Sequence, residues 1–159
     1  MRLTKTQKLV SSLLITFIVA AIGSIFTIPS IETWYLFLQK PAFTPPNWIF
    51  GPIWTALYLM MGLSFYLVWK KKAKKRQLKR AFEAYFAQLA LNLLWSIAFF
   101  GFRSLFGGVL IISALWASIL VTIYRFYKID KKATYLLIPY IFWVSAASFL
   151  NCFLWILNI

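Results

Sequence analysis

The side chains of this chain that could do chemistry are mainly aromatic. The sequence has eight tryptophans, eight tyrosines and no histidine, and its only carboxylates are Glu32, Glu83 and Asp130. None of these acids lies inside an apolar run, which excludes a proton relay, a carboxylate pair or a Ser-His-Asp triad. The commonest haem ligand is missing, and we expect no metal site. Indoles and phenols offer flat apolar faces with one polar edge, which suit an aromatic macrocycle or a sterol.

Placed on helices at 100° per residue, these side chains form three stripes. The stripes are Trp54, Tyr58 and Met61; Gln88, Asn92, Trp95 and Phe99; and Tyr140, Trp143, Ala147 and Asn151. An amide in lipid costs free energy unless it is paired, so we expect all three stripes to face inward. Packing between helices is the favoured role for Asn92 and Asn151 taken singly. For Trp54 and Trp143 we favour the wall of a cavity.

The elements that position these stripes must be membrane helices. Of the residues, 62% are hydrophobic, 20% are aromatic and only 13% are charged, which is not the composition of a soluble domain. A helix needs about 20 apolar residues to cross a bilayer. We expect an all-α membrane protein that forms a single domain over residues 1–159, a five-helix bundle with spans at about 9–31, 48–69, 82–102, 104–127 and 133–157.

The basic residues predict how the chain is oriented. All but two of the 17 lysines and arginines fall in three segments, which are Arg2 with Lys5 and Lys8, the run 70–80, and residues 125–132. Lys40 and Arg103 lie on the opposite side. By the positive-inside rule, the N-terminus and the basic loop 70–80 should be cytoplasmic, while the loop 32–47 and the C-terminus should lie outside. A cleaved secretory signal is the alternative for the first apolar run, but the run continues to Ile31.

The formal net charge of +14 would suggest nucleic acid as the partner of a soluble protein. Here the basic run lies between two spans. Topology and attraction to anionic membrane lipid, worth about 1 kcal/mol per residue near the surface, account for it. We therefore expect membrane lipid, and no nucleic acid, as a partner.

The loop 32–47 and the start of the second span are rich in proline. Residues 34–62 read WYLFLQKPAFTPPNWIFGPIWTALYLMMG, and each proline fixes φ and restricts the residue before it, so the connection is stiff and suited to be a lid. This stretch closely resembles the signature of the translocator protein family, also called the tryptophan-rich sensory proteins. The segment from Gln88 to Trp95 resembles the family's third helix, and Pro139-Tyr140-x-x-Trp143 resembles its fifth.

The resemblance implies a five-helix bundle with a pocket beneath the first loop. Members of the family bind porphyrins such as protoporphyrin IX and drug-like, benzodiazepine-type ligands, with no cofactor required. Together with the stripes, it marks as ligand-binding candidates Trp34, Pro45, Trp54, Tyr58, Asn92, Trp95, Phe99, Tyr140, Trp143, Ala147 and Leu150. Trp54 and Trp143 match the pair linked to porphyrin degradation in some bacterial members, and would be catalytic only if degradation occurs.

Departures from the family pattern narrow the expected function. Animal members carry a cholesterol-recognition sequence at the end of the fifth helix, whereas no basic residue follows Leu150 here, so a steroid-supply role is poorly supported. The short C-terminus and the charge bias favour a bacterial-type plasma membrane. The family implies a homodimer, while the small residues Ala87, Ala90, Ala114 and Ser118 fit a dimer face and internal packing equally well.

We therefore expect a membrane protein that binds a tetrapyrrole or a similar flat apolar ligand and acts as a sensor, carrier or scavenger. The first alternative is an enzyme that degrades porphyrin through indole radicals, light and oxygen. The second is a regulatory membrane subunit in which the aromatic residues only pack.

Overall fold

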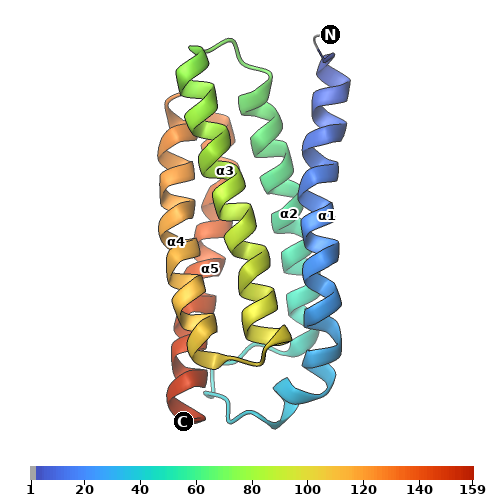
Figure 1. Cartoon of the computed structure of the whole chain (residues 1–159), viewed down its shortest axis with the longest axis vertical. Coiled ribbons are helices and arrows are strands. Elements are labelled where there is room, and N and C mark those ends of the chain that lie inside the picture. The colour runs from blue at the N-terminus through green and yellow to red at the C-terminus, as the bar shows by residue number, and fades with distance from the viewer. Residues whose placement is uncertain (1–2) are drawn as a thin grey trace.

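The computed structural model describes residues 3–159, so Arg2, which entered the orientation argument, lies outside the described residues. The chain forms a five-helix bundle of α1 (Lys5–Glu32), α2 (Asn47–Trp69), α3 (Lys75–Ser96), α4 (Leu105–Tyr127) and α5 (Lys131–Leu157) (Figure 1). Each helix is long and apolar enough to cross a membrane. Residues 3–159 contain no strand. The predicted fold class is therefore confirmed.

Several helices begin before the predicted spans, at Lys5 rather than 9 in α1 and at Lys75 rather than 82 in α3. The predicted basic loop 70–80 is helical from Lys75 onward, and only residues 70–74 separate α2 from α3. Lysine, arginine and glutamine are strong helix formers, so their charge limits where a helix can enter lipid but does not end the helix. The third helix also changes at Ser96 into a π-helical turn, η2 (Ile97–Gly101). In the loop 32–47, residues Trp34–Phe37 form a short 3₁₀ helix, η1.

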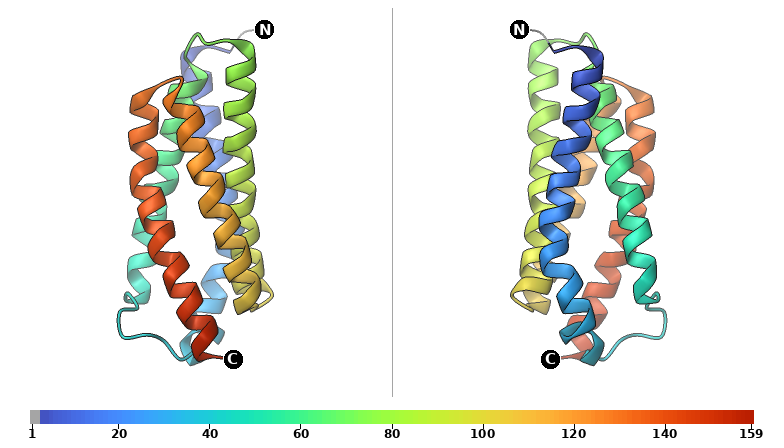
Figure 2. Two further views of the ribbon diagram at one scale, coloured as in Figure 1. Left: turned by 90° about the vertical axis from the view of Figure 1, so that its left-hand side faces the viewer. Right: turned by 90° about the vertical axis from the view of Figure 1, so that its right-hand side faces the viewer.

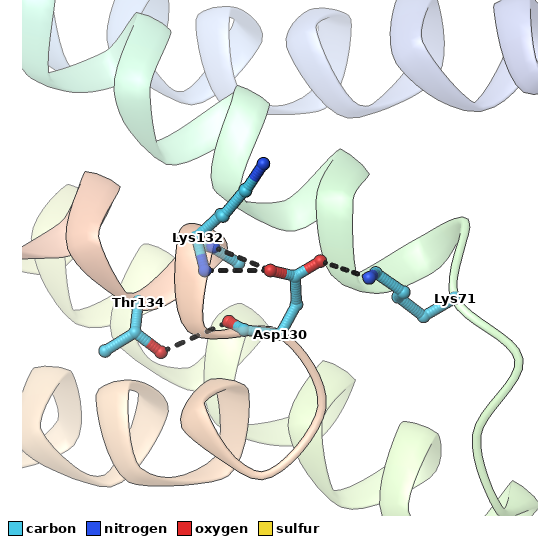
Figure 3. Close-up of polar contacts among 5 residues, drawn as sticks. Lys71, Asp130, Lys132 and Thr134 are labelled. Atoms are coloured by element: carbon cyan, nitrogen blue, oxygen red, sulfur yellow. Dashed lines mark hydrogen bonds and ion pairs between the residues drawn. The ribbon is translucent and has the colours of Figure 1, made fainter.

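Side chains cap several of the helices. The Thr4 hydroxyl accepts from the backbone N–H of Gln7, whose side chain accepts from the N–H of Thr4 in return. The Asp130 carboxylate accepts from the N–H of Lys132 at 2.8 Å and pairs with the Lys71 Nζ at 3.0 Å (Figure 3). A carboxylate stabilises a helix N-terminus, so Asp130 both starts α5 and ties it to the link after α2.

The bundle has two chemically different ends (Figures 1 and 2). The N-terminus, the α2–α3 link and the α4–α5 link lie at one end, which we call the basic end. The α1–α2 loop, the α3–α4 link and the C-terminus lie at the other, which we call the loop end. Lys40 and Arg103 therefore lie at the loop end, and the other basic residues of the described chain lie toward the basic end. Which end faces the cytoplasm stays a prediction.

Packing is tight toward the basic end. The ring of Phe65 stacks on that of Tyr85 with centroids 4.3 Å apart and planes within 3°, and the Tyr85 hydroxyl shares a 2.7 Å hydrogen bond with Thr16. A Cβ on Gly62 would lie 3.3 Å from the Leu13 Cα, so α1 and α2 touch there. A Cβ on Gly51 would meet nothing within 4 Å. Helices α1 and α2 thus diverge toward the loop end (Figure 2, right).

Candidate ligand-binding site

A cavity of about 570 Å³ lies in the loop-end half of the bundle. This volume is within the range of about 300–1,000 Å³ usual for small-molecule sites. Side chains from α1, α2, α3, η2 and α5 line it, with Tyr35 of η1. Eight of the eleven predicted site residues are among them, namely Trp54, Tyr58, Asn92, Trp95, Phe99, Trp143, Ala147 and Leu150. That they bind a ligand stays a prediction.

The other three predicted site residues lie outside the lining. Trp34 packs edge-on against Phe99, with ring centroids 5.5 Å apart. Tyr140 is fully buried and contacts Trp54 edge-on at 6.3 Å. Pro45 is half-buried in the α1–α2 loop. Trp34 and Tyr140 therefore support rings of the cavity wall from behind.

Hydrogen bonds between three helices form the floor of the cavity. The Tyr58 hydroxyl of α2 donates to the Asn92 Oδ1 of α3 at 2.5 Å, and the Asn92 Nδ2 donates to the Tyr140 hydroxyl of α5 at 3.0 Å. Asn92 is 1% exposed and also lines the cavity. The predicted inward stripes are confirmed because each has buried members, such as Tyr58, Asn92 and Asn151. Asn92 both packs between helices and lines the cavity.

Stacked rings form one wall. Trp54 stacks on Trp95 with centroids 6.2 Å apart, and Trp95 stacks on Phe99 at 5.5 Å with planes within 17°. The Trp95 indole N–H donates to the Asn151 Oδ1 at 3.1 Å, and the Asn151 Nδ2 donates to the Ala147 carbonyl at 2.9 Å. These bonds fix the ring of Trp95 against α5, so the wall is preformed.

Trp143 presents an unused hydrogen-bond donor. Its ring lines the cavity and contacts Phe50 edge-on at 5.9 Å. Its buried indole N–H has no hydrogen-bond partner among the described residues. The indole N–H of Trp116, by contrast, donates to the Ser145 hydroxyl at 2.8 Å. A buried tryptophan N–H usually finds a partner, so that of Trp143 is an unsatisfied donor at the cavity wall.

The cavity opens between α1 and α2. Its exposed lining residues all come from these two helices, and they are Phe17, Ala21, Ile28, Glu32, Trp48, Gly51 and Thr55. The sequence interpretation missed the contribution of α1. The signal was present, because the α1 lining follows a helical spacing of three and four residues from Phe17 to Ile31.

At its loop end, the cavity is covered by the α1–α2 loop, which is hydrogen-bonded to the end of the chain. The Gln39 N–H donates to the Asn158 Oδ1, and the Asn158 Nδ2 donates to the Gln39 carbonyl, each at 2.9 Å. Tyr35 is 3% exposed and packs on Phe100, and burial raises the pKa of its hydroxyl to about 12. The predicted lid is thus a loop pinned to α5 and η2. Motion of this loop as a lid stays a prediction.

The cavity holds little that could act as an acid or base. Glu32, at the open side, is its only charged lining residue. Among residues 3–159, no cluster of three or more His, Cys, Asp or Glu side chains could hold a metal ion. The Lys40 ammonium lies 4.7 Å from the Tyr35 ring centroid and donates to the Leu36 carbonyl, outside the lining. The site is therefore built for apolar contact and stacking.

Fold and site together define a multi-pass membrane protein with a tryptophan-lined cavity inside its helix bundle. The chain belongs to the TspO/MBR family, whose model matches residues 12–156. The Tryptophan-rich protein TspO of Archaeoglobus fulgidus is 42% identical, over 95% of this chain and 97% of that protein. Protein CrtK of Rhodobacter capsulatus is 38% identical, over 87% and 84%. The human Translocator protein is 34% identical, over 84% and 80%.

These relatives confirm the resemblance found in the sequence. The human relative is named a translocator protein, and a relative in Cereibacter sphaeroides is named a Tryptophan-rich sensory protein. Family membership supports a membrane sensor or binding role for this chain.

Proposed function

We propose that this protein binds a flat, apolar ligand of the tetrapyrrole class in its cavity and acts as a membrane sensor, carrier or scavenger. The observation that carries the proposal is the row of stacked rings, Trp54, Trp95 and Phe99, in one cavity with the unpaired indole N–H of Trp143. Stacked rings offer an extended flat surface to a macrocycle, and a turn of the Trp143 ring would let its N–H donate to one acceptor atom of the ligand.

The charge of the lining orients such a ligand. A porphyrin such as protoporphyrin IX carries two propionates, but the lining contains a carboxylate, Glu32, and no lysine or arginine. Burying an unpaired carboxylate costs several kcal/mol. The propionates therefore point out of the cavity into water or the headgroup region, and the apolar edge of the ring points toward Asn92.

The proposal includes a route from the bilayer. Two hydrogen bonds to Asn158 and the buried Tyr35 hold the loop end, whereas Phe17 and Trp48 line the cavity and are 37% and 73% exposed on the side between α1 and α2. An apolar ligand dissolved in lipid reaches this opening without crossing water. We also propose that the basic end is cytoplasmic, because basic residues favour that side.

Fluorescence quenching of the purified protein by protoporphyrin IX tests the site. Trp143→Ala removes a ring and a donor, and Ala147→Phe fills the cavity. An aromatic contact is worth about 0.5–1.5 kcal/mol beyond its area, so each variant should bind several-fold more weakly. Trp155→Ala is the matched control, because Trp155 packs on Phe106 outside the cavity lining. Equal affinities in the three variants would refute this site.

A second function, light-dependent degradation of porphyrin, is favoured by one observation. Trp54 and Trp143 line the same cavity, so both indoles would lie beside a bound macrocycle and could pass single electrons to it under light with oxygen. Bound porphyrin should then keep its absorption spectrum in the dark. Under light, Trp54→Phe with Trp143→Phe should still bind porphyrin and lose any degradation seen in the parent. Degradation in the dark without an oxidant would rule out this chemistry.

A further inference from the structure

Two basic segments that are distant in the sequence meet at the basic end. They line a cleft of about 290 Å³, formed by Lys74, Arg76, Gln77 and Arg80 of the α3 start and by Arg125 and Lys128 of the α4 end. Helices α3 and α4 lie side by side (Figures 1 and 2). The Thr122 hydroxyl of α4 donates to the Ala84 carbonyl of α3 at 3.1 Å, which fixes the two walls of the cleft relative to each other.

The cleft has no protein counter-charge. The acids nearest to it in sequence are already paired, Asp130 with Lys71 at 3.0 Å (Figure 3) and Glu83 with Lys79 at 3.8 Å. The five cations of the lining have no ion-pair partner within residues 3–159. Like charges gathered in one cleft repel one another. A bound anion would turn this repulsion into attraction.

The groups that line the cleft suit a phosphate in particular. Arginine presents a planar fork of N–H donors that can bond two phosphate oxygens at once, and the cleft contains Arg76, Arg80 and Arg125. Helix α3 begins beside the cleft without a side-chain cap, so the N–H groups of its first turn add to the positive potential. On the α4 side, the Lys128 Nζ lies 4.2 Å from the Tyr124 ring centroid, which restrains it.

The depth of the cleft points to lipid as the source of the phosphate. Tyrosines that pair with lysines ring this end of the bundle, with Lys70 over Tyr66 at 4.6 Å and Lys131 over Tyr127 at 5.4 Å. Tyrosine and tryptophan side chains are enriched at the level of the lipid headgroups, and the charged ends of lysine and arginine side chains also lie there. The cleft therefore begins at headgroup depth, and its volume fits one headgroup.

We propose that this cleft binds the phosphate headgroup of an anionic lipid. The proposal goes beyond the general attraction of basic loops to membranes, because that attraction depends on the number of charges and not on a shared cleft. It does not depend on the ligand of the cavity, which lies in the other half of the bundle.

Two double variants that each lose two positive charges distinguish a specific lipid site from diffuse electrostatic attraction. Arg80→Gln with Arg125→Gln removes two cleft cations, and Lys72→Gln with Lys75→Gln removes two cations of the same end that do not line the cleft. The purified variants are melted with increasing short-chain phosphatidylglycerol, and with phosphatidylcholine as the neutral reference. Hydrogen bonds to charged groups are stronger than those between neutral groups. Affinity for phosphatidylglycerol should therefore fall at least tenfold in the cleft pair and less than threefold in the control pair.

Melting without lipid shows whether each variant is folded, and lipid retained through purification is counted by native mass spectrometry as an independent measurement. An equal fall in both pairs would overturn the cleft and leave only diffuse charge. A further arm uses glycerol phosphate and inorganic phosphate. Stabilisation by either at the concentration effective for phosphatidylglycerol would overturn the assignment to lipid.

Discussion

Gly108 determines how closely α4 can approach the cavity wall, and replacing it by alanine tests that packing. A Cβ at this position would lie 2.5 Å from the Phe99 Cδ2 and 3.0 Å from the Asn151 Oδ1. Carbon atoms in contact prefer about 3.5–4.0 Å, so the Phe99 ring would have to move by about 1 Å. Trp34, Trp95 and Phe100 surround this ring. The cavity is the side on which it has room.

The magnitude follows from two opposed effects. Overpacking a filled site costs about 1–3 kcal/mol. Alanine in a helix is favoured over glycine by about 0.5–1 kcal/mol. Gly51→Ala has the second effect without overpacking against another helix, because its Cβ meets nothing within 4 Å beyond its chain neighbours; its position before Pro52 makes the gain smaller. The difference between the two variants therefore isolates the overpacking, and for a chain of this length it corresponds to a melting temperature lower by roughly 2–12 °C in Gly108→Ala.

The assay is thermal melting of both variants in one detergent, followed by titration with protoporphyrin IX. Gly108→Ala should melt below the parent or close to it, Gly51→Ala at or above the parent, and Gly108→Ala should also bind porphyrin more weakly because Phe99 enters the cavity. A Gly108→Ala variant that melts as high as Gly51→Ala would show that α4 is not held against this wall.

Three further outcomes are expected. Phe43→Cys in a Cys152→Ser background should be labelled from outside intact cells, because Phe43 is 57% exposed in the α1–α2 loop; labelling only after lysis would reverse the proposed orientation. Tyr58→Phe leaves the buried Asn92 Oδ1 without its donor, which should lower the free energy of unfolding by about 1–3 kcal/mol in a denaturant titration. Burial alone would raise the pKa of the Asp130 carboxyl, but its ion pair and two backbone N–H donors hold that pKa below 3.8. The stability that the ionised carboxylate contributes is complete above about pH 4. It is lost as the pH falls through the pKa of Asp130 in the folded protein. Asp130→Asn should therefore melt lower than the parent at pH 7 and show a smaller loss on acidification, and an unchanged acid-side slope would contradict this assignment.

The sequence was sufficient for the helices and for their inward faces. Uncharged runs have the length of a bilayer crossing, and helical spacing places Asn92, Trp95 and Phe99 on one side, where the structure buries them. The start of α3 was predicted too late, because basic residues indicate where a helix leaves the membrane and not where the helix begins. Lys75 begins a helix that extends beyond the apolar run.

Features that depend on contacts between helices could not be predicted. In the sequence, nothing distinguishes Gly108 from its neighbour Gly107, yet its lack of a side chain sets the α4 contact with Phe99. The π-helical turn η2, in which the Phe102 N–H donates to the Ile97 carbonyl at 2.8 Å, has no comparable signature in an apolar run. The basic cleft was likewise invisible, because Arg80 and Arg125 meet only through the packing of α3 on α4.

The cavity exists because packing is uneven along the bundle. Toward the basic end, the missing side chain of Gly62 lets Leu13 of α1 pack closely on α2. The stacked rings of Phe65 and Tyr85 fill the centre of the bundle there. Toward the loop end, the indoles of Trp54 and Trp95 stack on each other along one wall and leave the centre open. In water such an apolar opening would favour collapse of the helices. In a bilayer, lipid tails are as apolar as the cavity lining, so little hydrophobic force closes the gap. The packed half can therefore hold the helices in place while the open half remains accessible to an apolar ligand in the membrane.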